Sequence, residues 1–140
     1  MAVVVVDASV VVNWFHLEPD SSKARALFSQ GNDLVAPNLA LLELANALRR
    51  IVVSGTVSAP YAEQCLVDVT GMVIVVEENA DLILDALRLA LSLKHPIYDC
   101  IYLALAQRLN ARLVSADVQF IDKLVGTPDS ARVIDLAAWV

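Results

Sequence analysis

The chain has 140 residues, 58% of them hydrophobic, and a formal net charge of -6 at pH 7. This length fits a single domain, residues 1–140, and the aliphatic richness with only 4 glycines and 5 prolines excludes a disordered or low-complexity protein. The acidic balance also weighs against a nucleic-acid partner, which usually binds a basic face.

The chain shows no pattern for a membrane span, a signal peptide or a metal-binding cysteine set. Asp7, Glu43, Asp99 and the arginines interrupt the apolar runs before the roughly 18 residues that a spanning helix needs. No cationic region precedes the N-terminal apolar stretch, so we expect a cytoplasmic protein. Cys65 and Cys100 lack the spacing of a disulfide framework or a zinc site, and both are expected to be core thiols.

The predicted elements alternate between short aliphatic strands and longer segments of helical period. In chain order we expect a strand at 3–6, helices at 9–15 and 21–30, a strand at 34–36, helices at 39–53 and 58–69, a strand at 72–76, helices at 79–93 and 97–109, a strand at 112–115, a helix at 117–125 and a strand at 133–134. The first strand is apolar on both faces, as a central parallel strand requires. About five strands and about seven helices predict an α/β fold with a parallel sheet covered by helices.

Four carboxylates lie at the ends of these elements or within an apolar helix. Asp7 directly follows the first strand, and Asp117 follows the strand that ends at Ser115. Both are therefore expected at the carboxyl edge of the sheet, where open parallel sheets bind ligands. Asp99 falls in the first turn of a helix, whose dipole tolerates a carboxylate, and Glu43 lies one turn into the longest helix.

Each of the four also has a purely structural interpretation. Asp117 fits an N-cap, Asp99 an ordinary first-turn acid, Glu43 a solvent-facing residue and Asp7 a turn former. Together, however, four carboxylates at one edge would repel one another unless cations lay between them. An all-oxygen set without cysteine or histidine suits Mg²⁺ or Mn²⁺.

A metal at this edge changes what the net charge implies. If four of the 16 acidic residues hold metal, 12 remain against 10 basic residues, so the global charge describes the local field poorly. Hard cations of this kind keep waters and take phosphate oxygens as further ligands. The pattern therefore favours phosphodiester hydrolysis by a metal-activated water.

The four acids lie in segments with the sequences VVDASV at 5–10, LLELANAL at 41–48, IYDCIYLALA at 97–106 and LVSADVQF at 113–120. In this order and at these separations, the segments resemble the PIN-domain ribonucleases, specifically the VapC-type toxins of prokaryotic toxin-antitoxin pairs. The resemblance covers nearly the whole chain. It implies a three-layer α/β/α domain that cuts single-stranded or loop regions of RNA and that a cognate antitoxin blocks.

The resemblance also implies roles for individual residues. The acidic quartet that binds Mg²⁺ or Mn²⁺ falls on Asp7, Glu43, Asp99 and Asp117. Three supporting positions match as well: Ser9, Asn46 and Ser115. Ser9 could hydrogen-bond a carboxylate or a metal-bound water, and Ser115 keeps a hydroxyl where the family often has threonine. A rival acid, Asp122, is expected to face away from the site.

Basic and aromatic side chains are candidate contacts for RNA. The candidate phosphate contacts lie on two predicted helices: Arg49, Arg50, Lys23 and Arg25. Such contacts position a strand without reading its sequence, and the competing interpretation is solvated residues that complement helix dipoles. Trp14 and Phe15 could stack on a base, although core packing is the favoured interpretation.

Two histidines and two tyrosines are interpreted as structural residues. His16 and His95 lack a partner pattern and are expected at the surface. Tyr98 and Tyr102 flank Asp99 at helical spacing and are expected in the core.

The sequence is also compatible with functions of other classes. An aspartate-based phosphotransfer domain has an Asp after its first strand as well, but it requires a strand-end lysine where this chain has only Ser115 and Asp135. A non-catalytic binding module and a PIN nuclease of RNA processing are two further candidates. For a toxin, the apolar faces of the helices at 21–30 and 39–53 are where an antitoxin, or a second copy in a homodimer, would pack.

Overall fold

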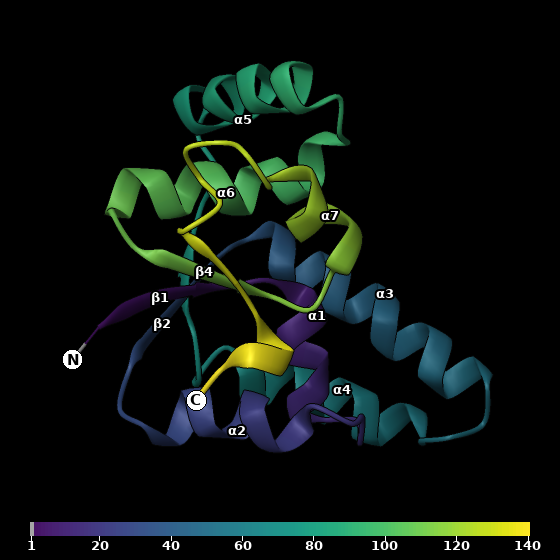
Figure 1. Cartoon of the computed structure of the whole chain (residues 1–140). Helices are drawn as coiled ribbons and strands as arrows, with labels where there is room; N and C mark the ends of the chain where they lie inside the picture. Colours follow the sequence, from purple (N-terminus) through teal and green to yellow (C-terminus); the bar gives the residue numbers. More distant parts are fainter. Residues whose placement is uncertain (1) are drawn as a thin grey trace.

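A parallel sheet of five strands forms the centre of the structure, a computed structural model that describes residues 2–140 (Figure 1). The strands are β1 Val3–Val6, β2 Asp33–Pro37, β3 Ile74–Val76, β4 Arg112–Ser115 and β5 Val133–Asp135. They lie in the order β3-β2-β1-β4-β5, and every neighbouring pair is parallel. The strand order reverses direction between β1 and β4, which is the place where α/β sheets bind ligands.

The valine run of β1 occupies the middle of the sheet. Val5 pairs with Val35 of β2 on one side and with Leu113 of β4 on the other. Val4, Val5 and Val6 are fully buried. β-branched side chains suit a strand buried on both faces, so this run forms the core strand, and the chain leaves it at Asp7.

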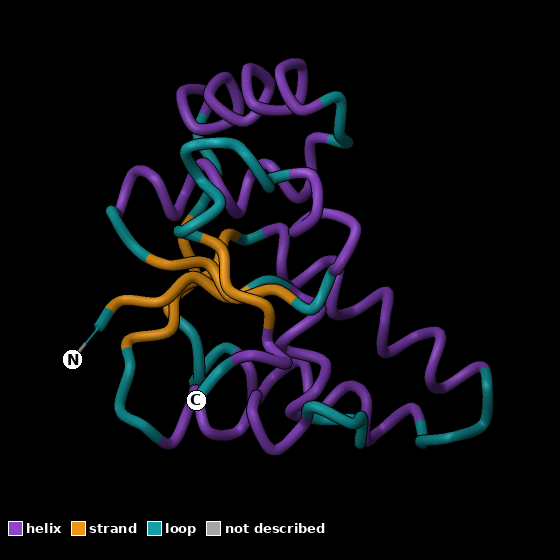
Figure 2. The backbone as a smooth tube through the Cα atoms, in the orientation of Figure 1, coloured by secondary structure: helices purple, strands orange, loops and turns teal. Residues whose placement is uncertain are grey.

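Helices cover both faces of the sheet and make three layers, with the strands between helices in Figure 2. On one face α6 Ile97–Leu109 packs against β1, β2 and β4, and α5 Ala80–Leu93 packs on α6. α7 Val118–Lys123 packs against β5. The other helices are α1 Ala8–Val11, α2 Ser21–Ser29, α3 Leu39–Val53 and α4 Ala59–Val69.

Burial of α6 on two sides explains its unbroken apolar sequence. Residues 100–106 are all buried, because the sheet covers one side of the helix and α5 the other. The first turn of α6 projects beyond this core and carries Asp99. Cys100 and Cys65 are buried free thiols, as expected, and burial raises the pKa of Cys100 to about 11.

The predicted elements differ from the structure mainly at their ends. The helix expected at 9–15 is α1 followed by a 3-10 turn, η1 Val12–Trp14, because the Trp14 indole N–H donates to the Ala24 carbonyl at 2.7 Å and draws the chain toward α2. β3 begins two residues later than expected, since Met72 and Val73 N–H groups still bond the carbonyl of Val69 at the end of α4. α7 is shorter than expected, and a second 3-10 turn, η2 Leu136–Ala138, was not predicted.

Within residues 2–140 we find no helix with the length and hydrophobicity to cross a bilayer.

Candidate active site

A cleft of about 520 Å³ opens at the carboxyl edge of the sheet, where the chain leaves β1 and β4. Its walls come from the turn after β1, from α3, from the start of α6 and from the residues after β4. Asp7, Glu43, Asp99 and Asp117 all line it. The fold thus brings together in one cavity four carboxylates that are spread over 111 residues of sequence.

Asp7 acts as a helix cap and lines the cleft at the same time. Its Oδ1 accepts from the backbone N–H of Ser9 at 2.9 Å and of Val10 at 3.3 Å, and also from the Ser9 hydroxyl. The residue is only 5% exposed. Burial raises the pKa of Asp7 to about 6 against the opposing hydrogen bonds from Ser115 and Ser9, and the negative charge of Asp99 raises it further.

Two serines connect the ends of β1 and β4. The Ser9 hydroxyl oxygen accepts from the backbone N–H of Ala116 at 2.9 Å, and that of Ser115 accepts from the backbone N–H of Asp117 at 3.0 Å. Ser9 and Ser115 also hydrogen-bond Asp7. These bonds fix the position of Asp7 relative to the Asp117 backbone, on the edge of the sheet where β1 and β4 end.

His95 contacts Asp99 directly. The His95 Nε2 lies 2.6 Å from Asp99 Oδ2. Burial raises the pKa of Asp99, the hydrogen bond from His95 lowers it, and the negative charge of Asp117 raises it. The expectation that His95 lies at the surface is wrong, since its side chain is 10% exposed and packs on Phe120. A histidine four residues before an acid, across the proline that begins a helix, is the signal that could have indicated this pair.

Tyr102 contacts Glu43 from the opposite wall. Its hydroxyl donates to Glu43 Oε1 at 2.5 Å, and burial raises the pKa of Glu43 despite this bond. Tyr102 is buried, as expected, yet its hydroxyl also reaches the cleft. The expectation that Tyr98 lies in the core is wrong: it is 58% exposed, because the first turn of α6 lies beyond the sheet.

Replacing Tyr102 by phenylalanine should lower the free energy of unfolding by about 1 to 2 kcal/mol, because Glu43 loses a buried donor. Urea denaturation measures this difference. Tyr98→Phe is the matched control on the same helix, and it should change stability by less than about 0.5 kcal/mol. Equal effects in the two variants would contradict a stabilising role for the Tyr102 hydroxyl.

Asp117 caps α7, where its Oδ1 accepts from the backbone N–H of Phe120 at 3.2 Å. The capping interpretation is therefore correct, and it coexists with a position in the cleft wall. Asp122 is exposed and does not line the cleft. Asn46 does line it, one turn of α3 beyond Glu43.

Sequence reasoning missed three polar residues of the cleft wall: Asn13, Glu18 and Asp20. The Asn13 amide nitrogen donates to the Ser9 carbonyl at 2.8 Å, while its Oδ1 is buried and has no hydrogen-bond partner among the described residues. Glu18 and Asp20 come from the turn before α2, and His16 lies 3.6 Å from Glu18. No local pattern shows that this turn folds back over the sheet edge.

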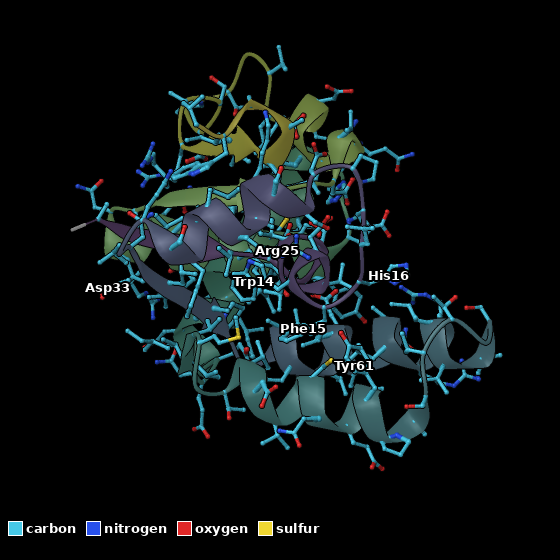
Figure 3. The ribbon with its side chains drawn as sticks, turned by 90° about the horizontal axis from the view of Figure 1, so that it is seen from below. Trp14, Phe15, His16, Arg25, Asp33 and Tyr61 are labelled. Atoms are coloured by element: carbon cyan, nitrogen blue, oxygen red, sulfur yellow. The ribbon has the colours of Figure 1, made fainter. Side chains whose placement is uncertain are left out.

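The structure separates the four candidate phosphate contacts. Arg50 lines the cleft, and it is the one basic residue to do so within residues 2–140. Arg49 instead lines an apolar groove beside α3. Lys23 donates to the carbonyl of Ala137, and Arg25 lies on α2, beside Trp14 on the face seen in Figure 3. The structure brings neither Lys23 nor Arg25 to the cleft.

Trp14 is buried in the core, in agreement with the favoured interpretation that it packs there and does not stack on a base.

The donor set of the cleft suits a hard divalent cation with bound waters. No three acidic, histidine or cysteine side chains in the described part of the chain form a ready-made ligand cage. Mg²⁺ usually binds through one or two carboxylates and keeps several waters, so it does not need such a cage. The buried carboxylate of Asp7, beside the negative charge of Asp99, and the unpartnered oxygen of Asn13 fit this mode of binding.

Comparison with known proteins gives the family. A family model described as PIN domain matches residues 4–123. The chain belongs to the PIN-domain family. This PIN domain is 31% identical over 121 residues to ribonuclease VapC3 of Pyrobaculum aerophilum, with 85% of this chain and 92% of the relative covered. The resemblance to VapC-type PIN domains is therefore confirmed.

Solved structures share the fold of this PIN domain. The crystal structure of PAE2754 from Pyrobaculum aerophilum superposes with a TM-score of 0.74 at 22% identity, covering 97% of this chain and 90% of that one. A toxin-antitoxin complex from Klebsiella pneumoniae gives a TM-score of 0.71 at 15% identity, covering 95% and 97%. The predicted α/β PIN-like fold with its parallel sheet is confirmed.

Proposed function

We propose that this PIN domain is a Mg²⁺- or Mn²⁺-dependent endoribonuclease and the toxin of a toxin-antitoxin pair. The observation that carries the proposal is that one cleft, at the carboxyl ends of β1 and β4, is lined by all four acids: Asp7, Glu43, Asp99 and Asp117. The 31% identity to a ribonuclease supports RNA as the substrate, and the Klebsiella pneumoniae neighbour, solved in a toxin-antitoxin complex, supports an antitoxin partner.

A divalent cation held by these carboxylates would supply stabilisation of the charge on a phosphate and would lower the pKa of a bound water, which is the chemistry that phosphodiester hydrolysis at neutral pH requires. Asp7 and Asp99 are the expected ligands, directly or through one water. Glu43 and Asp117 complete the set or orient the attacking water. Ser9 holds one oxygen of Asp7, and Tyr102 holds one oxygen of Glu43, so both carboxylates are already oriented before substrate arrives.

Cleavage of a single-stranded RNA tests the reaction. We expect activity with Mg²⁺ or Mn²⁺, none with EDTA, and none from Asp99→Asn. Cleavage that is indifferent to both EDTA and this substitution would reject a metal nuclease. A phosphoryl group trapped on Asp7 would instead establish phosphotransfer.

Arg50 is the residue we expect to contact an RNA phosphate, because it alone adds positive charge to the acidic cleft wall within residues 2–140. Arg50→Ala should raise KM for RNA by about tenfold, the loss of one charge-assisted hydrogen bond. It should also reduce the slope of log affinity against log salt by about 0.7. Arg49→Ala, one residue away, removes the same charge outside the cleft and should change neither quantity. Equal effects of both would mean that only overall charge matters.

The exposed apolar side of α3 is the surface we expect a protein partner to cover. Leu42 and Val53 are 71% and 73% exposed, and Leu39, Leu42, Ala45 and Tyr98 line a groove there. An antitoxin segment or a second copy of the chain would bury this surface. Expression should arrest growth, and co-expression of the cognate antitoxin should relieve the arrest. If no partner relieves it, the nuclease assignment could stand but the toxin assignment could not.

A further inference from the structure

His95 lies between two elements that carry acids of the cleft. Its Nε2 is 2.6 Å from Oδ2 of Asp99 on α6, and its ring centroid is 5.1 Å from that of Phe120 on α7. The backbone N–H of Phe120 in turn donates to Asp117, the N-cap of α7. One imidazole therefore contacts both the Asp99 carboxylate and the helix that Asp117 begins.

The backbone holds this imidazole in place. Lys94 ends α5 in the left-handed region with φ 51, and the N–H of His95 bonds the carbonyl of Ala90 at 3.1 Å. Pro96 follows directly as the N-cap of α6. From α7, the Lys123 ammonium donates to the Lys94 carbonyl at 3.1 Å. The ring is thus fixed by a helix end on each side and is 10% exposed.

The contact also has a definite donor and a definite acceptor. An ionised carboxylate is only an acceptor, so Nε2 is the donor in this pair whenever Asp99 is ionised, as a metal ligand is. A donor on Oδ2 restricts rotation of the Asp99 carboxylate, so Oδ1 is held in a fixed direction. Around bound metals, hydrogen bonds to the ligands from residues that do not touch the ion are worth about 10- to 100-fold in metal affinity or activity.

We propose that His95 is a positioning residue that fixes the Asp99 carboxylate for the divalent cation through its Nε2–H hydrogen bond. The inference rests on the proposed function, because it assigns His95 a role toward the metal of that same cleft. The competing explanation is that the ring only fills space against Phe120. The two explanations differ in what His95 must provide: the donor nitrogen in the first, and the ring as a whole in the second.

Two substitutions separate the donor from the ring. His95→Phe keeps a planar ring against Phe120 and removes the donor, whereas His95→Gln keeps a nitrogen donor at a similar position and removes the ring. Lys123→Ala is the matched control, because it breaks another attachment of α7 to the same turn without touching Asp99. Mn²⁺ alone is the probe, and calorimetric titration of each full-length variant gives its dissociation constant without any turnover.

We expect Mn²⁺ to bind His95→Phe about tenfold more weakly than the parent chain, His95→Gln within about threefold of it, and Lys123→Ala equally well. The Mn²⁺ concentration for half-maximal RNA cleavage should shift by the same factors. Parent-like binding by His95→Phe would overturn the proposal, and so would equal losses in the Phe and Gln variants or a matching loss in Lys123→Ala.

Unfolding temperatures without metal identify any variant that fails to fold. If His95→Phe does not fold, His95→Asn takes its place, because its amide stops short of Asp99 and its smaller side chain causes no clash; it should show the same tenfold loss. A parent chain that binds no Mn²⁺ and cuts RNA equally well in EDTA would reject the proposed function itself. Metal-dependent cleavage by the parent with unchanged Mn²⁺ binding by His95→Phe would reject only the role of His95.

Discussion

Asp7→Asn is expected to abolish RNA cleavage and, without metal at neutral pH, to make the protein more stable. If Asp7 is the metal ligand that we propose, its loss removes several kcal/mol of transition-state stabilisation, which corresponds to about a thousandfold or more in rate. The fold should tolerate the change, because asparagine is as good an N-cap as aspartate and can still accept from the N–H groups of Ser9 and Val10.

The gain in stability follows from the burial of Asp7. Its pKa is raised from 3.8 to about 6, mainly by desolvation, so the ionised carboxylate destabilises the metal-free fold at pH 7 by about 3 kcal/mol. Asparagine removes that charge, and the melting temperature in EDTA should rise by about 10 °C.

Asp135→Asn is the matched control, since Asp135 also caps a helical turn but lies outside the cleft. It should leave cleavage unchanged and alter stability by less than about 0.5 kcal/mol. An Asp7→Asn protein that cleaves RNA normally, or that is less stable than the parent in EDTA, would contradict the assignment of Asp7 as a buried metal ligand.

The second expected result is a pH dependence of stability in the metal-free protein. A carboxyl whose pKa is higher in the folded chain binds its proton more tightly when folded, so protonation stabilises the fold. For Asp7 this stabilisation is complete below about pH 4 and is lost as the pH rises through about 6. The raised pKa values of Glu43 and Asp99 act in the same direction.

Denaturation curves of the parent chain and of Asp7→Asn, collected in EDTA from pH 4 to pH 8, isolate this contribution from that of all other groups. The stability difference should be near zero at the acid end and reach about 3 kcal/mol above pH 6. Saturating Mn²⁺ at pH 7 should stabilise only the parent, by about 2.7 kcal/mol at a hundred times the dissociation constant. A stability difference that does not vary with pH would show that Asp7 has an ordinary pKa.

Much of the fold was predictable because its signals are local. The bounds of α3 and α6 agree with the predicted ranges 39–53 and 97–109, and α4 ends at Val69, where the predicted helix 58–69 ends, with Ser58 as its N-cap. Apolar periodicity, caps and breakers act within a few residues, so a short window of sequence contains them. Local reasoning also placed Asp7 and Asp117 together, since residues that follow parallel strands meet at one edge of the sheet, whereas Glu43 and Asp99 were selected by their positions within helices.

The contacts that orient those acids depend on pairs far apart in the chain. Tyr102 meets Glu43 across 59 residues, and Ala116 meets Ser9 across 107. Helical spacing alone did not reveal which of Tyr98 and Tyr102 faces inward, because the answer depends on where the sheet ends beneath α6. Likewise, only the packed structure shows that Arg50 lines the cleft and that Arg49 lines the groove beside α3.

Sequence patterns were therefore sufficient for the order of the elements, the fold class and the choice of four acids that the fold brings into one cleft. The environment of each acid came from the packed chain: the desolvation of Asp7, the donors to Asp99 and Glu43, and the turn that adds Glu18 and Asp20 to the cleft. Local propensity acts between neighbours in sequence. Burial and hydrogen bonding in the cleft arise only when distant segments pack together, so they are properties of the folded chain and not of any one segment.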